Sequence, residues 1–167
     1  MAFRTALADI RTMKALFTAA EDEAAALGDE QPGAEHLLLA ALTLHDDSAR
    51  SAFAMLGVTV EQVRSAIGQV HAAALGAVGI DAGTDGVRGL SEPSRPLTGP
   101  YRSTGSAQDL FQRARRLSDA DKPAILRAAH IAIAAAEAER GTVRRVLELL
   151  GVDRTRLTGA ARAAMAA

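Results

Sequence analysis

Apolar residues recur every three or four positions over residues 3–27, a spacing that predicts one long amphipathic helix. The segment contains neither Gly nor Pro until Gly28, a residue type that commonly ends helices. The predicted apolar stripe consists of Phe3, Leu7, Ile10, Met13, Leu16, Phe17, Ala20, Ala24 and Leu27. After Pro32 and Gly33, a second predicted helix runs to about Leu44 and is apolar nearly all round. Such a helix is usually buried at the centre of its domain.

Two further helices are predicted in the first part of the chain. One begins at Asp46 or Asp47, either of which suits an N-cap, and ends before Gly57. The next opens at Thr59, and Gln62 three positions later completes a capping box. The apolar face of that helix is formed by Val60, Val63, Ile67 and Val70.

The composition changes over residues 76–105, which are rich in Gly, Pro, Ser and Thr and predict a linker or surface loop. Helical patterns resume afterwards, with Ser106 as the expected N-cap of the next helix. Gly141 and Gly151 mark two breaks, and Asp153 suits the N-cap of the last helix. The helices predicted here span about 106–118, 122–140, 142–150 and 153–166.

The sequence repeats itself internally. Shifting it by 94 residues aligns the two parts without a gap. The aligned pairs include Phe17 with Phe111, His36 with His130, and the run Leu-Gly-Val at residues 56–58 with the same run at 150–152. We therefore expect an all-α fold of about eight helices in two pseudo-symmetric four-helix repeats, residues 1–75 and 106–167, joined by the linker 76–105. A groove is expected at the junction of the repeats.

Composition narrows the function classes. With 49% hydrophobic and 3% aromatic residues, the chain can build an interior and has few of the residues that favour strands. The absence of Cys excludes disulfides and thiolate zinc sites and suits a reducing cytoplasm. A net charge of −1 argues against a dedicated nucleic-acid binder. No apolar stretch approaches the ~20 residues that cross a bilayer, and no signal-peptide pattern opens the chain. Membrane partners are therefore not expected.

Three segments of the first repeat carry a resemblance to a known family. Residues 20–28 read AEDEAAALG, residues 32–42 read PGAEHLLLAAL, and residues 56–59 read LGVT. In this order and spacing they resemble the N-terminal domain of Clp chaperones, a double repeat of four helices, and the likeness extends over nearly the whole chain. The second repeat is degenerate, because Ala129 and His130 stand where the family has Glu-His.

The resemblance implies an interaction module. In ClpC- and ClpA-type chaperones this domain precedes the ATPase rings and recruits adaptors and substrates. The sequence contains no G-x-x-x-x-G-K-[ST] motif, so the chain is expected to be a stand-alone, non-catalytic paralogue without a cofactor. The expected partners are peptide segments, adaptor or substrate proteins, a Clp ATPase in trans, or cyclic-peptide antibiotics that the module would sequester.

Two other functions stay open. One is a phosphoarginine-degron receptor, since Glu35 matches the first of the family's arginine-binding glutamates and a carboxylate suits a guanidinium. The second glutamate falls on Ala129, however, and Glu35 is also what a helix dipole favours in a first turn. The other is a helical regulatory protein that retains only the repeat fold.

These hypotheses on function indicate candidate residues for ligand binding and for structural roles. The candidate ligand-binding residues are Glu35, Phe3, Lys14, Gln108, Arg113 and Tyr101. His36 and His130 are expected to hydrogen-bond loop backbone and fix the start of each second helix, and Gly57 and Gly151 to follow a helix end. No metal site is expected, because the His residues lack further ligands at metal-binding spacing.

Some side chains are expected to have no ligand at all. His45 and His71 are expected to face solvent, and Arg113, Arg115 and Arg116 to form a solvated helix face. Phe17, Phe53 and Phe111 are predicted to pack in the core.

No signature of Ser/His/Asp catalysis is present, so no enzyme is expected. A further hypothesis is that residues 76–105 cap the groove, with Tyr101 as a built-in ligand.

Overall fold

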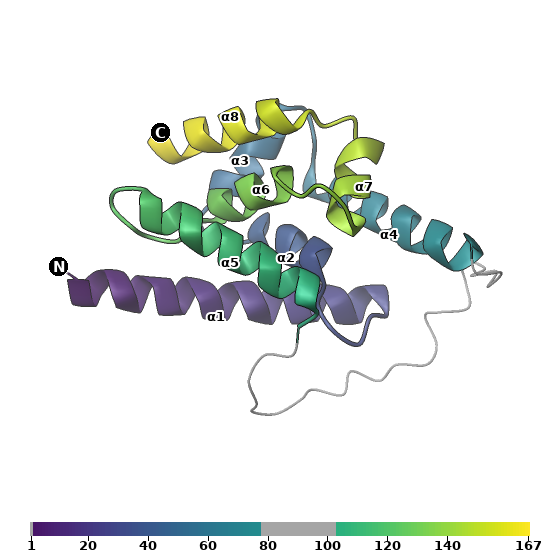
Figure 1. The fold of residues 1–167 in the computed structure, drawn as a ribbon, viewed down its shortest axis with the longest axis horizontal. Helices are drawn as coiled ribbons and strands as arrows, with labels where there is room; N and C mark the ends of the chain where they lie inside the picture. The colour runs from purple at the N-terminus through teal and green to yellow at the C-terminus, as the bar shows by residue number, and fades with distance from the viewer. Residues whose placement is uncertain (1, 78–102) are drawn as a thin grey trace.

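The computed structural model describes residues 2–77 and 103–167, and of the first helix it describes side chains from Leu7 onward. The described residues form eight helices and no strand, which confirms the all-α prediction (Figure 1). The helices are α1 (Ala2–Leu27), α2 (Ala34–Ala41), α3 (Ser48–Met55), α4 (Val60–Ala77), α5 (Gly105–Ala120), α6 (Ala128–Ala136), α7 (Thr142–Leu149) and α8 (Arg154–Ala166). None of these helices is long and apolar enough to span a bilayer.

Helices α2 and α6 occupy the centre of the molecule, where every residue of both is buried. In Figure 1, α1 and α5 lie on one side of this pair and α3 and α8 on the other. Across the repeats, α3 packs against α8 and α4 packs against α7. The predicted packing role of the aromatic residues is confirmed, because Phe53 is buried and the rings of Phe17 and Phe111 lie 5.0 Å apart between α1 and α5.

Several predicted helix boundaries are wrong. Helix α5 begins one residue before Ser106, and its N-cap is Thr104, whose hydroxyl accepts a hydrogen bond from the backbone N–H of Ala107 (3.3 Å). Helix α2 ends at Ala41 rather than near Leu44, and α6 begins at Ala128 rather than at 122. The segment before α6 is not helical, and the N–H of Leu126 donates to a carboxylate of another helix instead of to a backbone oxygen one turn earlier.

The acceptor of the Leu126 N–H is Asp9 of α1, and this hydrogen bond connects the first helix to the second repeat. One carboxylate oxygen accepts the N–H of Leu126 at 2.9 Å, and the other lies 2.6 Å from a guanidinium nitrogen of Arg115. Arg115 is therefore not part of a solvated face, as the sequence predicted, but half-buried between α1 and α5. The apolar stripe of α1 is buried only from Leu16 onward, while Leu7 and Ile10 are 45% and 57% exposed.

The start of α6 is capped from the other repeat. Its own N-cap residue, Arg127, provides no side-chain cap. Instead, Asp46 accepts the N–H of Ala128 at 2.7 Å, and the hydroxyl of Ser48 accepts the N–H of Ala129 at 2.9 Å. Asp46 also accepts the N–H of Ser48 (3.2 Å), so the carboxylate orders the beginning of α3 as well. The two repeats therefore share polar contacts in addition to their apolar core.

Candidate functional site

The Glu-His motif at the start of α2 belongs to a cluster of four titratable side chains. The backbone N–H of Gly33 donates to Nδ1 of His36 at 2.9 Å, the loop contact that the sequence predicts for this histidine. Nε2 of His36 lies 3.2 Å from the Asp29 carboxylate. Glu35, which is 9% exposed, lies 3.2 Å from Nε2 of His71. Nδ1 of His71 also lies 3.3 Å from the Asp29 carboxylate, which links the two pairs.

The prediction that His71 faces solvent without a partner is therefore wrong. Helix α4 carries this side chain back onto α2, where it bridges the carboxylates of Asp29 and Glu35. The hydrogen bond with Glu35 and the charge of both carboxylates raise the pKa of His71, against the opposing effect of burial. Burial alone would raise the pKa of Glu35, but the hydrogen bonds from His71 and from backbone hold it below its ordinary value. The contact with His36 lowers the pKa of Asp29.

The second repeat holds a reduced version of this cluster. The backbone N–H of Arg127 donates to Nδ1 of His130 at 3.0 Å, and Nε2 of His130 lies 3.0 Å from Asp121. Asp121 also pairs with Arg162 at 2.7 Å. Ala129, at the position of Glu35, is fully buried and has no carboxylate to offer. The sequence does not predict the roles of Asp29 and Asp121, because nothing in their local pattern distinguishes them from loop residues.

The remaining candidate residues are not gathered at one site. Lys14 is exposed on α1, Gln108 donates to the backbone oxygen of Ser103 (3.3 Å), and Arg113 pairs with Glu137 (3.3 Å). The side chain of Phe3, and all of Tyr101 with its proposed capping role, lie outside the described residues. Gly57 and Gly151 follow helix ends with φ of 75° and 65°, and His45 is exposed as predicted. Among the described residues, no group of three or more His, Asp or Glu is arranged to hold a metal ion.

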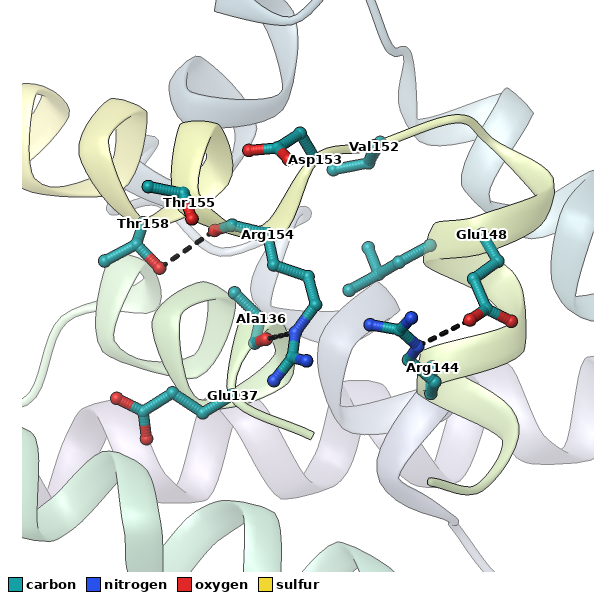
Figure 2. Close-up of a pocket in the computed structure, with 10 residues that line it drawn as sticks. Ala136, Glu137, Arg144, Glu148, Val152, Asp153, Arg154, Thr155 and Thr158 are labelled. Atoms are coloured by element: carbon teal, nitrogen blue, oxygen red, sulfur yellow. Dashed lines mark hydrogen bonds and ion pairs between the residues drawn. The ribbon is translucent and has the colours of Figure 1, made fainter. Parts of the chain in front are cut away.

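Two cavities lie inside the repeats rather than at their junction. The first cavity, about 680 Å³, is formed by α3, the loop after it, the start of α4 and the end of α2. It is lined by Leu42, Thr43, Arg50, Phe53, Ala54, Gly57, Val58, Thr59, Val60, Glu61 and Arg64. The second cavity, about 480 Å³, is formed by the equivalent elements of the second repeat (Figure 2). It is lined by Ala136, Glu137, Arg144, Leu147, Glu148, Val152, Asp153, Arg154, Thr155 and Thr158.

The two cavities are equivalent by the internal repeat. Adding 94 to the number of a residue that lines the first cavity gives one that lines the second, and Gly57 is the single exception. Val60, for example, corresponds to Arg154 (60 + 94), and Glu61 corresponds to Thr155 (61 + 94). This agreement, found in three dimensions, supports the register that the sequence alone suggested. Once the first cavity is known, the 94-residue shift predicts the position of the second cavity. The sequence alone does not show where the first cavity lies.

Comparisons with known proteins agree with this architecture. Residues 11–85 match the family model described as the Clp repeat (R) N-terminal domain. No curated protein sequence matches the chain. Among solved structures, the chain is similar to the N-terminal domain of the caseinolytic protease associated chaperone ClpD from Arabidopsis thaliana. The two share 20% sequence identity with a TM-score of 0.61, over 92% of this chain and 91% of that one.

The structural likeness concerns the fold and covers both repeats, whereas the family model covers the first repeat and part of the segment after it. This division matches the sequence, in which the second repeat is the degenerate one. Residues 11–85 therefore belong to the Clp repeat N-terminal domain family, and the chain as a whole has the fold of a Clp N-terminal domain.

Proposed function

We propose that the chain is a non-catalytic interaction module of the Clp protease system, acting in the cytoplasm, that binds peptide segments of substrates or adaptors. Clp N-terminal domains are interaction modules, and the family match of residues 11–85 together with the fold of the chain supports this proposal. The observation that carries the proposal is the first cavity, because it is open, largely apolar and large enough to receive a side chain of a peptide.

The chemistry of the first cavity suits an apolar side chain with polar backbone around it. Phe53 and Leu42 are buried behind the cavity, and Val58 and Val60 line it, so an entering apolar group would be removed from water. Arg64 lies at the rim and is held by Glu23 of α1 at 2.7 Å. A fixed guanidinium at the rim can hydrogen-bond the carbonyl groups of an extended peptide.

The arrangement at Glu35 argues against phosphoarginine recognition. A guanidinium ligand needs an accessible carboxylate, whereas this one is buried and bonded to His71. The second repeat offers Ala129 at the equivalent position. The first cavity, rather than Glu35, is the proposed binding site.

The test is a fluorescence titration with a peptide that carries a Leu-Phe pair among Gly and Ser residues, and with its Ser-Ser twin. The protein is compared with Val60→Glu, which places a carboxylate on the apolar wall of the first cavity, at the position whose equivalent in the second cavity is Arg154. We expect the Leu-Phe peptide to bind and the variant to weaken it by about tenfold or more, because an apolar group would then meet a charge. The matched control is Ala73→Glu on the exposed side of α4, outside the cavity.

Two results would overturn the proposal. Equal binding of both peptides would exclude recognition of an apolar side chain, and equal loss in both variants would exclude the first cavity as the site.

A Clp-directed cyclic peptide and an arginine-phosphorylated peptide are titrated in parallel. Tight binding of the cyclic peptide alone would indicate sequestration of antibiotics. No binding to any of them would favour a regulatory protein, to be tested next for a complex with a Clp ATPase in trans.

A further inference from the structure

The second cavity has kept the shape of the first but not its chemistry. Between the equivalent positions, Val60 is replaced by Arg154, Ala54 by Glu148 and Arg64 by Thr158. The apolar wall is also reduced, with Ala136 and Leu147 at the positions of Leu42 and Phe53. A side chain of the size of Phe or Leu would bury less apolar surface here. The second cavity is therefore built for a different kind of group.

Two guanidinium groups point into this cavity. Figure 2 shows the side chains of Arg144 and Arg154 reaching into the same space from α7 and from the start of α8. Nε of Arg154 donates to the backbone oxygen of Ala136 at the end of α6. Nε of Arg144 donates to Glu148 at 2.6 Å. Each guanidinium is thus fixed through Nε. Within the described parts of the chain, no acceptor is recorded for the terminal nitrogens of either group.

Of the three acidic residues around the cavity, Glu148 pairs with Arg144, and the other two bond groups other than Arg144 and Arg154. Glu137 pairs with Arg113 of α5 at 3.3 Å, and Asp153 accepts the N–H of Arg156 at 2.8 Å as the N-cap of α8. In Figure 2, the carboxylates of Glu137 and Asp153 lie away from the space between the two guanidinium groups, and the carboxylate of Glu148 reaches Nε of Arg144 from the side opposite Arg154. Two guanidinium groups therefore face one cavity, and the acid that pairs with one of them, Glu148, bonds Nε of Arg144 and does not lie between the two groups.

We propose that the second cavity is an oxyanion-binding site that holds a carboxylate or phosphate group between Arg144 and Arg154. A guanidinium has two terminal nitrogens in a plane that matches two oxygens of such a group, and a second guanidinium completes the fork. The first turn of α8 adds its positive end, because residues 153–155 line the cavity. This site is separate from the first cavity. Failure of anion binding in the second cavity would therefore leave the proposed peptide binding in the first cavity unaffected, and the reverse also holds.

The test follows backbone amide and arginine Nε–H NMR signals of the full chain during titration with four probes. The probes are inorganic phosphate, succinate, a Gly-Ser peptide with a free C-terminal carboxylate and the same peptide as its C-terminal amide. We expect saturable shifts at Arg154, Thr155 and the side chain of Arg144. The shifts should weaken as salt rises, because the contact is between charges.

Arg154→Gln is expected to weaken binding about tenfold or more, as the loss of a charge-assisted hydrogen bond implies. Arg144→Gln is a second variant, which leaves the hydrogen bond from Arg154 to the backbone oxygen of Ala136 in place. The control is Arg156→Gln, an exposed neighbour in the same helix turn that does not line the cavity. It should bind as the unchanged chain does.

The outcomes separate the sources of the oxyanion. Binding of the carboxylate peptide but not of its amide would support the proposal and identify a peptide C-terminus. Binding of phosphate or succinate without either peptide would support it and identify a free small anion. The proposal is wrong if none of the anionic probes shifts these signals, or if Arg156→Gln weakens binding as much as Arg154→Gln does.

Discussion

Gly33 matters because of the space that its missing side chain leaves. A Cβ placed there would lie 2.7 Å from both carboxylate oxygens of Glu35. The backbone at Gly33 is extended (φ −92°, ψ −179°), a conformation open to any residue, so the constraint is steric and not conformational. The carboxylate is itself fixed by His71. One small residue thus sets the geometry of the buried cluster at the start of α2.

We therefore expect Gly33→Ala to displace the Glu35 carboxylate from His71 and to lower the free energy of unfolding by about 1–3 kcal/mol, as overpacking usually does. Urea denaturation followed by circular dichroism measures this change. In a His71→Gln background the same substitution should cost less, because the contact it disrupts is already gone. An equal cost in both backgrounds would show that the clash does not act through His71.

The cluster also makes stability depend on pH in a defined direction. Because the pKa of His71 is raised by Glu35, its contribution is complete below about pH 6.5, the ordinary value, and is lost as pH rises through the folded value. The lowered pKa values of Asp29 and Glu35 act oppositely. Their contribution is present above about pH 4 and is lost as pH falls through their folded values.

Substitution of His71 by Gln should consequently remove part of the stability near pH 6, about 1 kcal/mol for a charged hydrogen bond, and less near pH 8. The free energy of unfolding would be measured by urea titration at intervals between pH 5 and 8. His45→Gln, at an exposed position, is the control and should leave the pH profile unchanged. Parallel profiles for the unchanged chain and His71→Gln would contradict the assignment.

At this scale the sequence predicted one half of the site. The hydrogen bond of His36 to loop backbone follows from its place in a helix start, which is a local feature. His71 and Asp29 could not be paired with it, since 35 positions separate the two histidines (71 − 36) and only the packing of α4 on α2 brings them together. Local patterns do not contain that information.

At the scale of elements, the start of α6 depends on contacts from the other repeat. Its first N–H groups are satisfied by Asp46 and Ser48 of the other repeat, and these groups are buried. Burial opposes ionisation of Asp46, but the hydrogen bonds from Ala128 and Ser48 hold its pKa below the ordinary value. The helix that the sequence predicted to begin at 122 therefore begins where the other repeat can cap it.

Asp46→Ala is expected to cost about 2–3 kcal/mol of the free energy of unfolding, because a buried N–H loses a charged acceptor. Ser48→Ala should cost about 1–2 kcal/mol for the same reason with a neutral acceptor. Asp47→Ala is the matched control. Its side chain makes no cap bond and pairs with the exposed Arg50, so the expected cost is below about 0.5 kcal/mol. Equal costs for Asp46→Ala and Asp47→Ala would exclude the cap across the repeats.

Helix existence was easier to predict than helix limits. The apolar period identified every helix that the structure describes, and the capping box of Thr59 and Gln62 is present, with bonds of 2.8 and 3.2 Å. The predicted limits are wrong at Thr104, which caps α5 locally through its own hydroxyl, and at Ala128, where a contact from the other repeat decides where α6 begins. The exposure of Leu7 and Ile10 could not be predicted either. An apolar stripe does not show how far along the helix the packing partner extends.

At the scale of the whole molecule, the repeats share one core. Helix α6 contacts α2 and α3 of the first repeat as well as its own neighbours, and Ile131 within it is 1% exposed. The repeat in the sequence predicted this pairing, since each unit alone is too small to bury its helices well. The sequence did not predict the two cavities, because a cavity depends on how side chains fill the space between helices.

Ile131→Ala should therefore destabilise both repeats together, by about 2–5 kcal/mol. Hydrogen exchange read by NMR is expected to show faster exchange in α2 and α3 as well as in α5 and α8. Leu149→Ala, at a position that is 51% exposed, is the control and should have little effect. Faster exchange confined to the second repeat would show that the repeats unfold separately.

The equivalence of the two cavities has a practical consequence. Both are framed by the same backbone elements in one molecule, at one concentration and under one set of conditions, while their side chains differ at known positions. A ligand that prefers one over the other thereby reports side-chain selectivity with the scaffold held constant. Each binding experiment on this chain therefore includes an internal comparison, because a substitution in one cavity leaves the side chains of the other cavity unchanged.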